Sequence, residues 1–214
     1  MSLELFYHPL SSYCWKVLTA LYENETPFEH RLLNLGDPAA RDALVALWPI
    51  AKFPVLSDGE RVIPEASIII DYLAHHHAGR TALIPADPDE ARSVRLKDRF
   101  YDLYVHDPMQ RIVGNKLRPA DAKDPHGVAE CDARLETAYG MIEQEMATRT
   151  WANGASFTMA DCAAAPALHY ANRVHPIGDA RPNTLAYLER LKQRPSFARV
   201  LREAEPYAGM FPGR

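Results

Sequence analysis

The sequence predicts a small α/β domain followed by an all-α helical bundle domain. Over the first 80 residues, short strand-like runs alternate with helix-like runs, whereas beyond residue 88 apolar residues recur at helical spacing without a strand pattern. The segment TALIPADP at 81–88 separates the two halves, because it contains two prolines and no convincing period. We therefore expect a first domain at 1–80, a linker at 81–88 and a helical domain at 89–214.

The first domain is expected to follow the order β-α-β-α-β-β-α. Apolar runs and the hairpin signal Asp58-Gly59 predict its strands, and helical periodicity, with Ile69 and Leu73 on one face, predicts its helices. The expected strands lie at 3–7, 28–35 and on both sides of Asp58-Gly59 within 54–63. The expected helices lie at 12–24, 38–47 and 65–77.

In the helical half, prolines and one glycine mark the expected breaks between helices. The expected helices lie at 89–115, 127–149, 158–173, 182–193 and 196–204. The expected breaks lie at Pro119, Pro125, Gly154, Pro176 and Pro195. One helix start is especially clear, because Thr158 and Asp161 form an acidic variant of the capping box. We interpret that segment as a folding signal without a role in chemistry.

Composition places the 214-residue chain among ordinary soluble globular proteins, with 47% hydrophobic and 24% charged residues. The net charge of -4 and the lack of like-charge runs argue against a nucleic-acid or membrane partner. No apolar run approaches the roughly 18 residues that span a bilayer, and the start of the sequence lacks a signal-peptide pattern. Cys14, Cys131 and Cys162 lie far apart, so we expect reduced thiols in a cytoplasmic protein.

Three turns of the first domain carry the residues best suited to chemistry. The helix start in FYHPLSSYCWKV places Ser11 and Ser12 where a serine is either a plain N-cap or part of an anion site. In KFPV at 52–55 a proline precedes a strand, a position at which proline often marks a special turn, including a cis one. In PEAS at 64–67 a carboxylate and a hydroxyl stand at another helix start. The expected order of elements allows all three turns to face one side of the sheet.

Taken together, five features resemble the cytosolic glutathione transferase family: the order of elements, the S-x-x-C helix start, the KFPV turn, the PEAS helix start and the FTMAD capping segment. The likeness runs over essentially the whole chain and is nearest in style to the serine-type theta, tau and zeta classes. It implies a thioredoxin-like N-terminal domain that binds glutathione, and a helical C-terminal domain that lines a second-substrate pocket for a small hydrophobic electrophile. It also implies a homodimer that uses glutathione as substrate and requires no metal.

The resemblance implies roles for single residues of the first domain. Ser11 falls on the catalytic serine, and Phe53, before the expected cis-proline Pro54, would pair its backbone with the cysteinyl part of glutathione. Lys52 would approach the glycyl carboxylate, and Glu65 would meet the γ-glutamyl amino group. The remaining residues expected to bind glutathione are Ser12, Val55, Ala66 and Ser67.

Two positions depart from the family pattern. Ala66 replaces a serine whose hydroxyl and amide bind the γ-glutamyl carboxylate, so the amide remains and Ser67 is the candidate to supply the hydroxyl. Ala51 replaces a common glycine. Neither departure removes the expected site.

The expected chemistry follows from ionisation of the glutathione thiol. A free thiol has a pKa of about 8.5, and a helix N-terminus lowers it. A hydrogen bond donated by the Ser11 hydroxyl also favours the thiolate. Lowering the thiol pKa by about two units corresponds to about 2.7 kcal/mol of preference for the thiolate. The sulfur then attacks an electrophile held by the helical domain. Tyr104 and Arg111 are expected to line that pocket, although core packing explains the aromatic stripe around them equally well.

Other interpretations of these residues stay open. Cys14 is either a reactive thiol or a packing residue, and its place one turn inside the helix favours packing, while Tyr7 is the minority candidate for catalysis. Consecutive helical residues point about 100° apart, so His75 to His77 indicate a solvated helix end rather than a metal site. The same site would also suit a glutathione-dependent isomerase, dehalogenase or peroxidase. The fold alone would suit a non-enzymatic interaction module.

Overall fold

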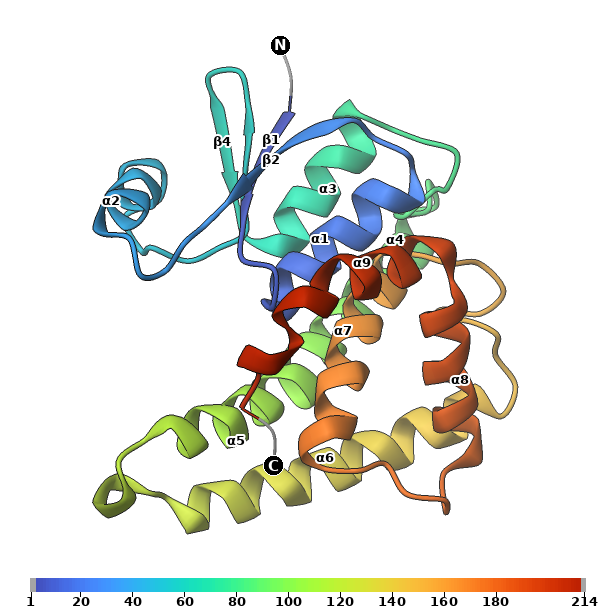
Figure 1. Ribbon diagram of the computed structural model, residues 1–214. Coiled ribbons are helices and arrows are strands. Elements are labelled where there is room, and N and C mark those ends of the chain that lie inside the picture. The colour runs from blue at the N-terminus through green and yellow to red at the C-terminus, as the bar shows by residue number, and fades with distance from the viewer. Residues whose placement is uncertain (1–2, 213–214) are drawn as a thin grey trace.

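The computed structural model describes residues 3–212, and Figure 1 shows a sheet domain seated on a helical domain. The sheet contains β1 (Leu3–Tyr7), β2 (Phe28–Leu32), β3 (Val55–Asp58) and β4 (Arg61–Pro64) in the order β2-β1-β3-β4. β1 and β2 run parallel, whereas β3 is antiparallel to both β1 and β4. The predicted hairpin is confirmed, since Asp58 pairs with Arg61 across two residues and Gly59 has a φ of 62°.

Both faces of the sheet are covered, but unequally. Alternate residues of β1 point to opposite faces, and Leu3, Leu5 and Tyr7 join the main core beneath α1 (Ser12–Glu23) and α3 (Ala66–His76). On the other face α2 (Pro38–Leu47) contributes Leu44 to a small separate cluster. In Figure 1, α2 stands apart from the helices on the opposite face.

The second domain is all helical, as the sequence predicts. Its long helices are α4 (Pro88–Phe100), α5 (Asp107–Leu117), α6 (Pro125–Met146), α7 (Met159–Val174), α8 (Pro182–Gln193) and α9 (Pro195–Ala204). Two short 3-10 turns, η2 (Ala120–Ala122) and η3 (Glu205–Met210), follow α5 and α9. Within residues 3–212, no helix combines the length and the apolar character that a membrane span needs.

The helix expected at 89–115 is divided by a π-helical turn. This turn, η1 (Tyr101–His106), joins α4 to α5, and the Asp107 N–H donates to the Asp102 carbonyl five residues back instead of four. Pro108 accounts for the altered register, because it has no N–H to donate to the preceding turn. The expected breaks at Pro125 and Pro195 are wrong by one position, since each proline is the first residue of a helix, where its missing N–H costs nothing.

α1 forms the middle of the molecule. It packs against α3 in its own domain and against α7 and α9 in the helical domain, and every residue from Cys14 to Glu23 is buried. A helix enclosed on all sides must satisfy its polar side chains internally. Lys16 and Glu23, its two buried charged residues, therefore determine how the domains meet.

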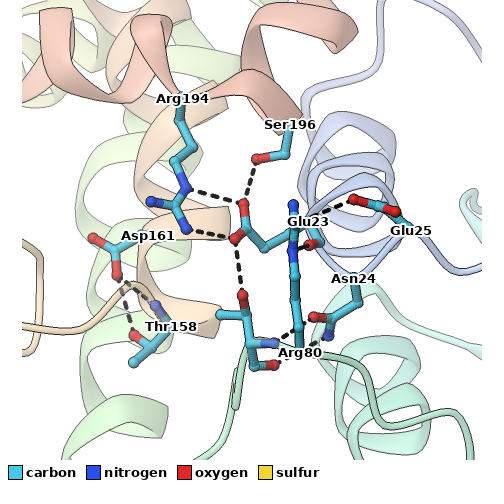
Figure 2. Close-up of polar contacts among 9 residues, drawn as sticks. Glu23, Asn24, Glu25, Arg80, Thr158, Asp161, Arg194 and Ser196 are labelled. Carbon is cyan, nitrogen blue, oxygen red and sulfur yellow. Dashed lines mark hydrogen bonds and ion pairs between the residues drawn. The ribbon is translucent and has the colours of Figure 1, made fainter.

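Glu23 is the meeting point of α1, the interdomain segment and α9, as Figure 2 shows. Its carboxylate accepts a hydrogen bond from Arg194 Nε at 3.0 Å and another from the Ser196 hydroxyl at 2.8 Å. Thr81 Oγ1 donates to it at 2.9 Å. Burial raises the pKa of Glu23, but these hydrogen bonds outweigh burial and hold the pKa below its usual range. The carboxylate also lies at the positive end of α9.

The predicted capping box at the start of α7 is confirmed. The Thr158 N–H donates to Asp161 Oδ2 at 2.8 Å. Asp161 Oδ1 accepts from the Ala152 N–H at 2.8 Å and from the Tyr187 hydroxyl at 2.7 Å. This fully buried carboxylate therefore binds the preceding loop and α8 as well as its own helix start.

Replacing Asp161 with alanine should lower the free energy of unfolding by about 3 kcal/mol, because it leaves two buried N–H groups and a tyrosine hydroxyl without an acceptor. Urea denaturation followed by circular dichroism measures the change. The control Asp179→Ala removes an exposed carboxylate and should cost less than about 0.5 kcal/mol. Equal losses in the two variants would contradict the role given to the box.

Candidate functional site

The sheet register brings the three predicted turns to one edge. Phe6, near the end of β1, pairs with Val55 at the start of β3, and Val55 pairs in turn with Pro64 at the end of β4. Neighbouring strands lie about 4.8 Å apart. The helix starts that follow β1 and β4, and the proline turn that precedes β3, therefore flank one site.

Ser11 is the N-cap of α1, with φ of -77° and ψ of 120°. Its Oγ accepts a long hydrogen bond of 3.4 Å from the Cys14 N–H, and its own N–H donates to the His8 carbonyl at 3.1 Å. The hydroxyl also hydrogen-bonds to the Cys14 thiol, and since a hydroxyl proton rotates to suit its acceptor, it could turn to a ligand sulfur instead. The half-buried hydroxyl stands at the positive end of α1.

The turn before β3 has the expected cis peptide between Phe53 and Pro54. Pro54 and Val55 are buried, Phe53 is half-buried, and Lys52 is exposed. Ala51 has a φ of 56°, in the left-handed region that glycine adopts at lower cost. The departure from glycine that the sequence reveals at this position is therefore accommodated by a strained backbone.

A second strained residue begins α3. Glu65 is its N-cap, with φ of 70° and an exposed side chain that caps no N–H group. Such a backbone costs about 1–3 kcal/mol in a residue other than glycine, and strain of this kind collects at functional sites. The N–H groups of Ala66 and Ser67 open the helix and have no acceptor within it, so they can receive a carboxylate.

The hydroxyl of Ser67 is engaged away from this helix start. It donates to Asp98 Oδ2 at 2.7 Å and accepts from Lys16 Nζ at 2.8 Å. The Ser67 hydroxyl, which we expected to replace the hydroxyl missing at Ala66, therefore already has hydrogen-bond partners. Only the backbone amide of Ser67 is left for a ligand.

Ser12 is likewise committed to the domain boundary. It is buried, and its hydroxyl is hydrogen-bonded to Nε2 of His106, the last residue of η1. Burial, together with the charge of Lys16, lowers the pKa of His106 to about 3, so the ring is neutral. The Ser12 side chain thus orients the start of α1 from the helical domain.

Lys16 completes this buried polar cluster. Its ammonium lies 2.6 Å from Asp98 Oδ1 and 2.8 Å from Asp102 Oδ2. Burial alone lowers the pKa of Lys16, but the two carboxylates overcome this effect and raise it. Burial raises the pKa of Asp98, and the neighbouring Asp102 carboxylate adds to the increase. We infer that Lys16 is charged and that Asp98 and Asp102 together balance its positive charge.

The alternative nucleophiles are occupied or enclosed. The Cys14 thiol is fully buried, and burial raises its pKa to about 12, which fits the packing role. The Tyr7 hydroxyl is bonded to His30 Nδ1 at 2.8 Å, and burial raises its pKa to about 12. His77 is bonded to Asp58 at 2.8 Å. Within residues 3–212, no group of three side chains is arranged to hold a metal ion.

The structure separates the two residues expected in the second-substrate pocket. Tyr104 lines a groove between η1 and α6, together with Phe100 and Met141. Arg111 lines another hollow between α5 and α6, and its side chain pairs with Asp107 at 3.0 Å. Ser11 lines neither hollow. Tyr104 and Arg111 therefore line separate hollows, and their role in a second-substrate pocket stays a prediction.

The sequence also contains a signal for the buried cluster, although that signal is not part of any of the motifs described above. Lys16 is the lone charged residue in the apolar run YCWKVLTALY. Asp98, Asp102 and His106 recur every four residues in the segment whose side chains reach Lys16 and Ser12. A lone lysine in an apolar run needs a buried partner, and acidic residues at helical spacing are the candidates to supply one.

Comparisons with known proteins agree with this architecture. A family model described as "Glutathione S-transferase, N-terminal domain" matches residues 5–81, and "Glutathione S-transferase, C-terminal domain" matches residues 125–190. Glutathione S-transferase 3 of Zea mays is 30% identical over 208 residues, which cover 93% of this chain and 93% of that protein.

Two solved structures have the same fold. A glutathione S-transferase from Methylobacillus flagellatus with GSH bound is 26% identical, with a TM-score of 0.84, over 93% of this chain and 98% of that one. A glutathione S-transferase from Methylobacterium radiotolerans in complex with glutathione sulfonate is 26% identical, with a TM-score of 0.80, over 94% of both chains.

Replacing Lys16 with methionine should lower the free energy of unfolding by about 3–5 kcal/mol at neutral pH, because two buried carboxylates lose their cation. Without it, burial would raise the pKa of Asp98 in the native state further above its value in the unfolded state. Stability is then retained at low pH and lost as the pH rises through the raised value, so the deficit should be smaller in acid. Urea denaturation across pH measures this dependence.

The control Lys192→Met breaks a surface ion pair with Glu189 and should have an effect below about 1 kcal/mol at any pH. A Lys16→Met deficit that does not change with pH would contradict the assignment of unpaired carboxylates.

Proposed function

The chain belongs to the glutathione S-transferase family, and on this premise we propose that it is a serine-type enzyme that ionises the thiol of glutathione for attack on small electrophiles. The observation that carries the proposal is the half-buried Ser11 hydroxyl, which stands at the N-cap of α1 beside the turn with the cis peptide. A hydroxyl and a helix N-terminus that face one sulfur both favour its charged form.

The rest of glutathione would lie along the sheet edge. The Phe53 backbone beside Pro54 would pair with the cysteinyl part, and Lys52, which is exposed, would approach the glycyl carboxylate. The free N–H groups at the start of α3 would receive the γ-glutamyl carboxylate, with Glu65 beside the amino group. We therefore also propose that the first domain, residues 1–80, binds glutathione and that the helical domain, residues 89–214, holds the electrophile.

A small hydrophobic electrophile is supported by aromatic residues that reach the loop before Ser11. The Tyr170 hydroxyl donates to the Leu10 carbonyl at 3.0 Å, and the Phe211 ring lies 4.9 Å from the Tyr170 ring. Since Tyr170 is buried, the half-buried Phe211 ring would be the apolar group that holds an electrophile beside the thiolate and excludes water. The three free thiols of the chain support a cytoplasmic location.

Titration of glutathione into the protein from about pH 5 to about pH 9, followed by thiolate absorbance, tests the site. The thiolate should form about two pKa units below free glutathione, and Ser11→Ala should abolish most of that shift. The control Ser57→Ala, in the β-hairpin, should behave as the parent protein. Binding without a shift that depends on Ser11 would move catalysis to another residue.

The same thiolate would serve related reactions. Assays with a maleyl compound, a halogenated aromatic compound and a hydroperoxide distinguish isomerase, dehalogenase or transferase, and peroxidase activity, since each demands different chemistry of one sulfur. A complete lack of glutathione binding would favour the non-enzymatic interaction module.

We also propose that the protein is a homodimer and that the groove beside Tyr104 takes part in the contact. This groove, of about 710 Å³, is lined mainly by apolar atoms of α4, η1 and α6, with the charged residues Glu130 and Arg134 also in its lining. Tyr104 is 49% exposed and Met141 is 47% exposed, which is unusual for neighbouring large side chains of this kind. A second copy would cover them.

Replacing Tyr104 and Met141 together with glutamate should convert the dimer to monomer, because two charges would enter an apolar interface. Sedimentation velocity measures the outcome. Leu117→Glu is the control, since Leu117 is 71% exposed at the end of α5, outside the groove. A double variant that sediments like the parent dimer would exclude this surface.

A further inference from the structure

His8 lies in the loop between β1 and α1, three residues before Ser11. Its Nδ1 accepts the Leu10 N–H at 3.2 Å, and its backbone carbonyl accepts the Ser11 N–H at 3.1 Å. The ring and the backbone of His8 are thus both fastened to the turn that carries the serine.

The ring also reaches the second turn of the site. Its centroid is 6.1 Å from that of the Phe53 ring, next to the cis peptide before β3. His8 therefore stands between the serine turn and the proline turn, which under the proposed function hold the sulfur and the cysteinyl backbone.

The hydrogen bond at Nδ1 determines what the ring offers to a ligand. A neutral imidazole that accepts at Nδ1 carries its proton on Nε2, where it donates and cannot accept. Burial lowers the pKa of His8, so this neutral form prevails at neutral pH. Among residues 3–212, Nε2 has no hydrogen-bond partner, and the ring is only half-buried.

We propose that His8 is a second catalytic residue, whose Nε2–H donates a hydrogen bond to the thiolate sulfur of glutathione beside the Ser11 hydroxyl. The inference rests on the proposed function. Since Nε2 has no free lone pair, the thiol proton passes to solvent rather than to the ring. Its contribution is to stabilise the anion that remains.

Two substitutions test the roles of the two imidazole nitrogens separately. His8→Asn retains an oxygen near the position of Nδ1 to accept the Leu10 N–H, but its amide is too short to donate where Nε2 does. His8→Gln extends an amide N–H toward the Nε2 position. His76→Asn, which removes an exposed ring of α3, is the control.

The measurement is the thiolate titration of bound glutathione, together with the glutathione Kd at a pH where the thiol is protonated. His8→Asn should raise the thiolate pKa by about one unit, which is a tenfold fall in the ratio of thiolate to thiol at any given pH, without changing that Kd. His8→Gln should recover most of the shift. His76→Asn should leave both quantities unchanged.

The outcomes distinguish this inference from the proposed function. If the parent protein lowers the thiolate pKa through Ser11 but His8→Asn does not raise it, the role of His8 is wrong and the proposed function stands. If His8→Asn and His8→Gln both weaken the binding of protonated glutathione, His8 only shapes the loop, and the inference is overturned. If the parent protein shows no shift that depends on Ser11, both proposals fail.

Discussion

The buried Lys16 ammonium is the interaction on which the meeting of the two domains depends. Ser12 and Lys16 stand four residues apart on α1, and Asp98, Asp102 and His106 repeat the same spacing across α4 and η1. The π-helical turn keeps both Asp102 and His106 on the side that faces α1. An ion enclosed in this way contributes little net stability compared with an apolar pair, but it penalises every other alignment of the helices. We infer that the cluster favours the one register of the helices in which Lys16 keeps both carboxylates.

That register matters because the candidate site is formed by the ends of helices and strands rather than by their middle residues. The helix start after β1, the helix start after β4 and the turn before β3 meet because Phe6, Val55 and Pro64 are neighbours in the sheet. Each end presents unpaired N–H groups or a strained backbone, which no interior residue of a helix or strand would supply. The helical domain holds these ends in place through Ser67 and the Leu10 carbonyl, so chemistry at the sheet edge depends on packing behind it.

Much of this arrangement could be predicted from the sequence, because local signals carried it. Three short motifs each determine the local backbone geometry: the Asp58-Gly59 turn, the capping box of Thr158 and Asp161, and the proline before Val55. Side-chain partners across the domain boundary could not be predicted in this way, since periodicity shows which residues are buried but not which residues they face. Ser12 and Ser67 both stand at helix starts suited to a ligand, yet each points its hydroxyl into the boundary. Tyr104 and Arg111 share a helical segment but line different hollows, because the π-helical turn changes the face that follows it.

The Glu23 junction has a consequence for how such chains can be recombined. One carboxylate from the first domain accepts hydrogen bonds from Arg194 and Ser196, which begin the last long helix, and from Thr81 between the domains. A chimera that joins the sheet domain of one relative to the helical domain of another would inherit half of this junction. Unless both parents carry the acid and its donors, the hybrid would bury a charge without a partner. Fragments suited to exchange are therefore defined by matched polar junctions rather than by the position of the linker.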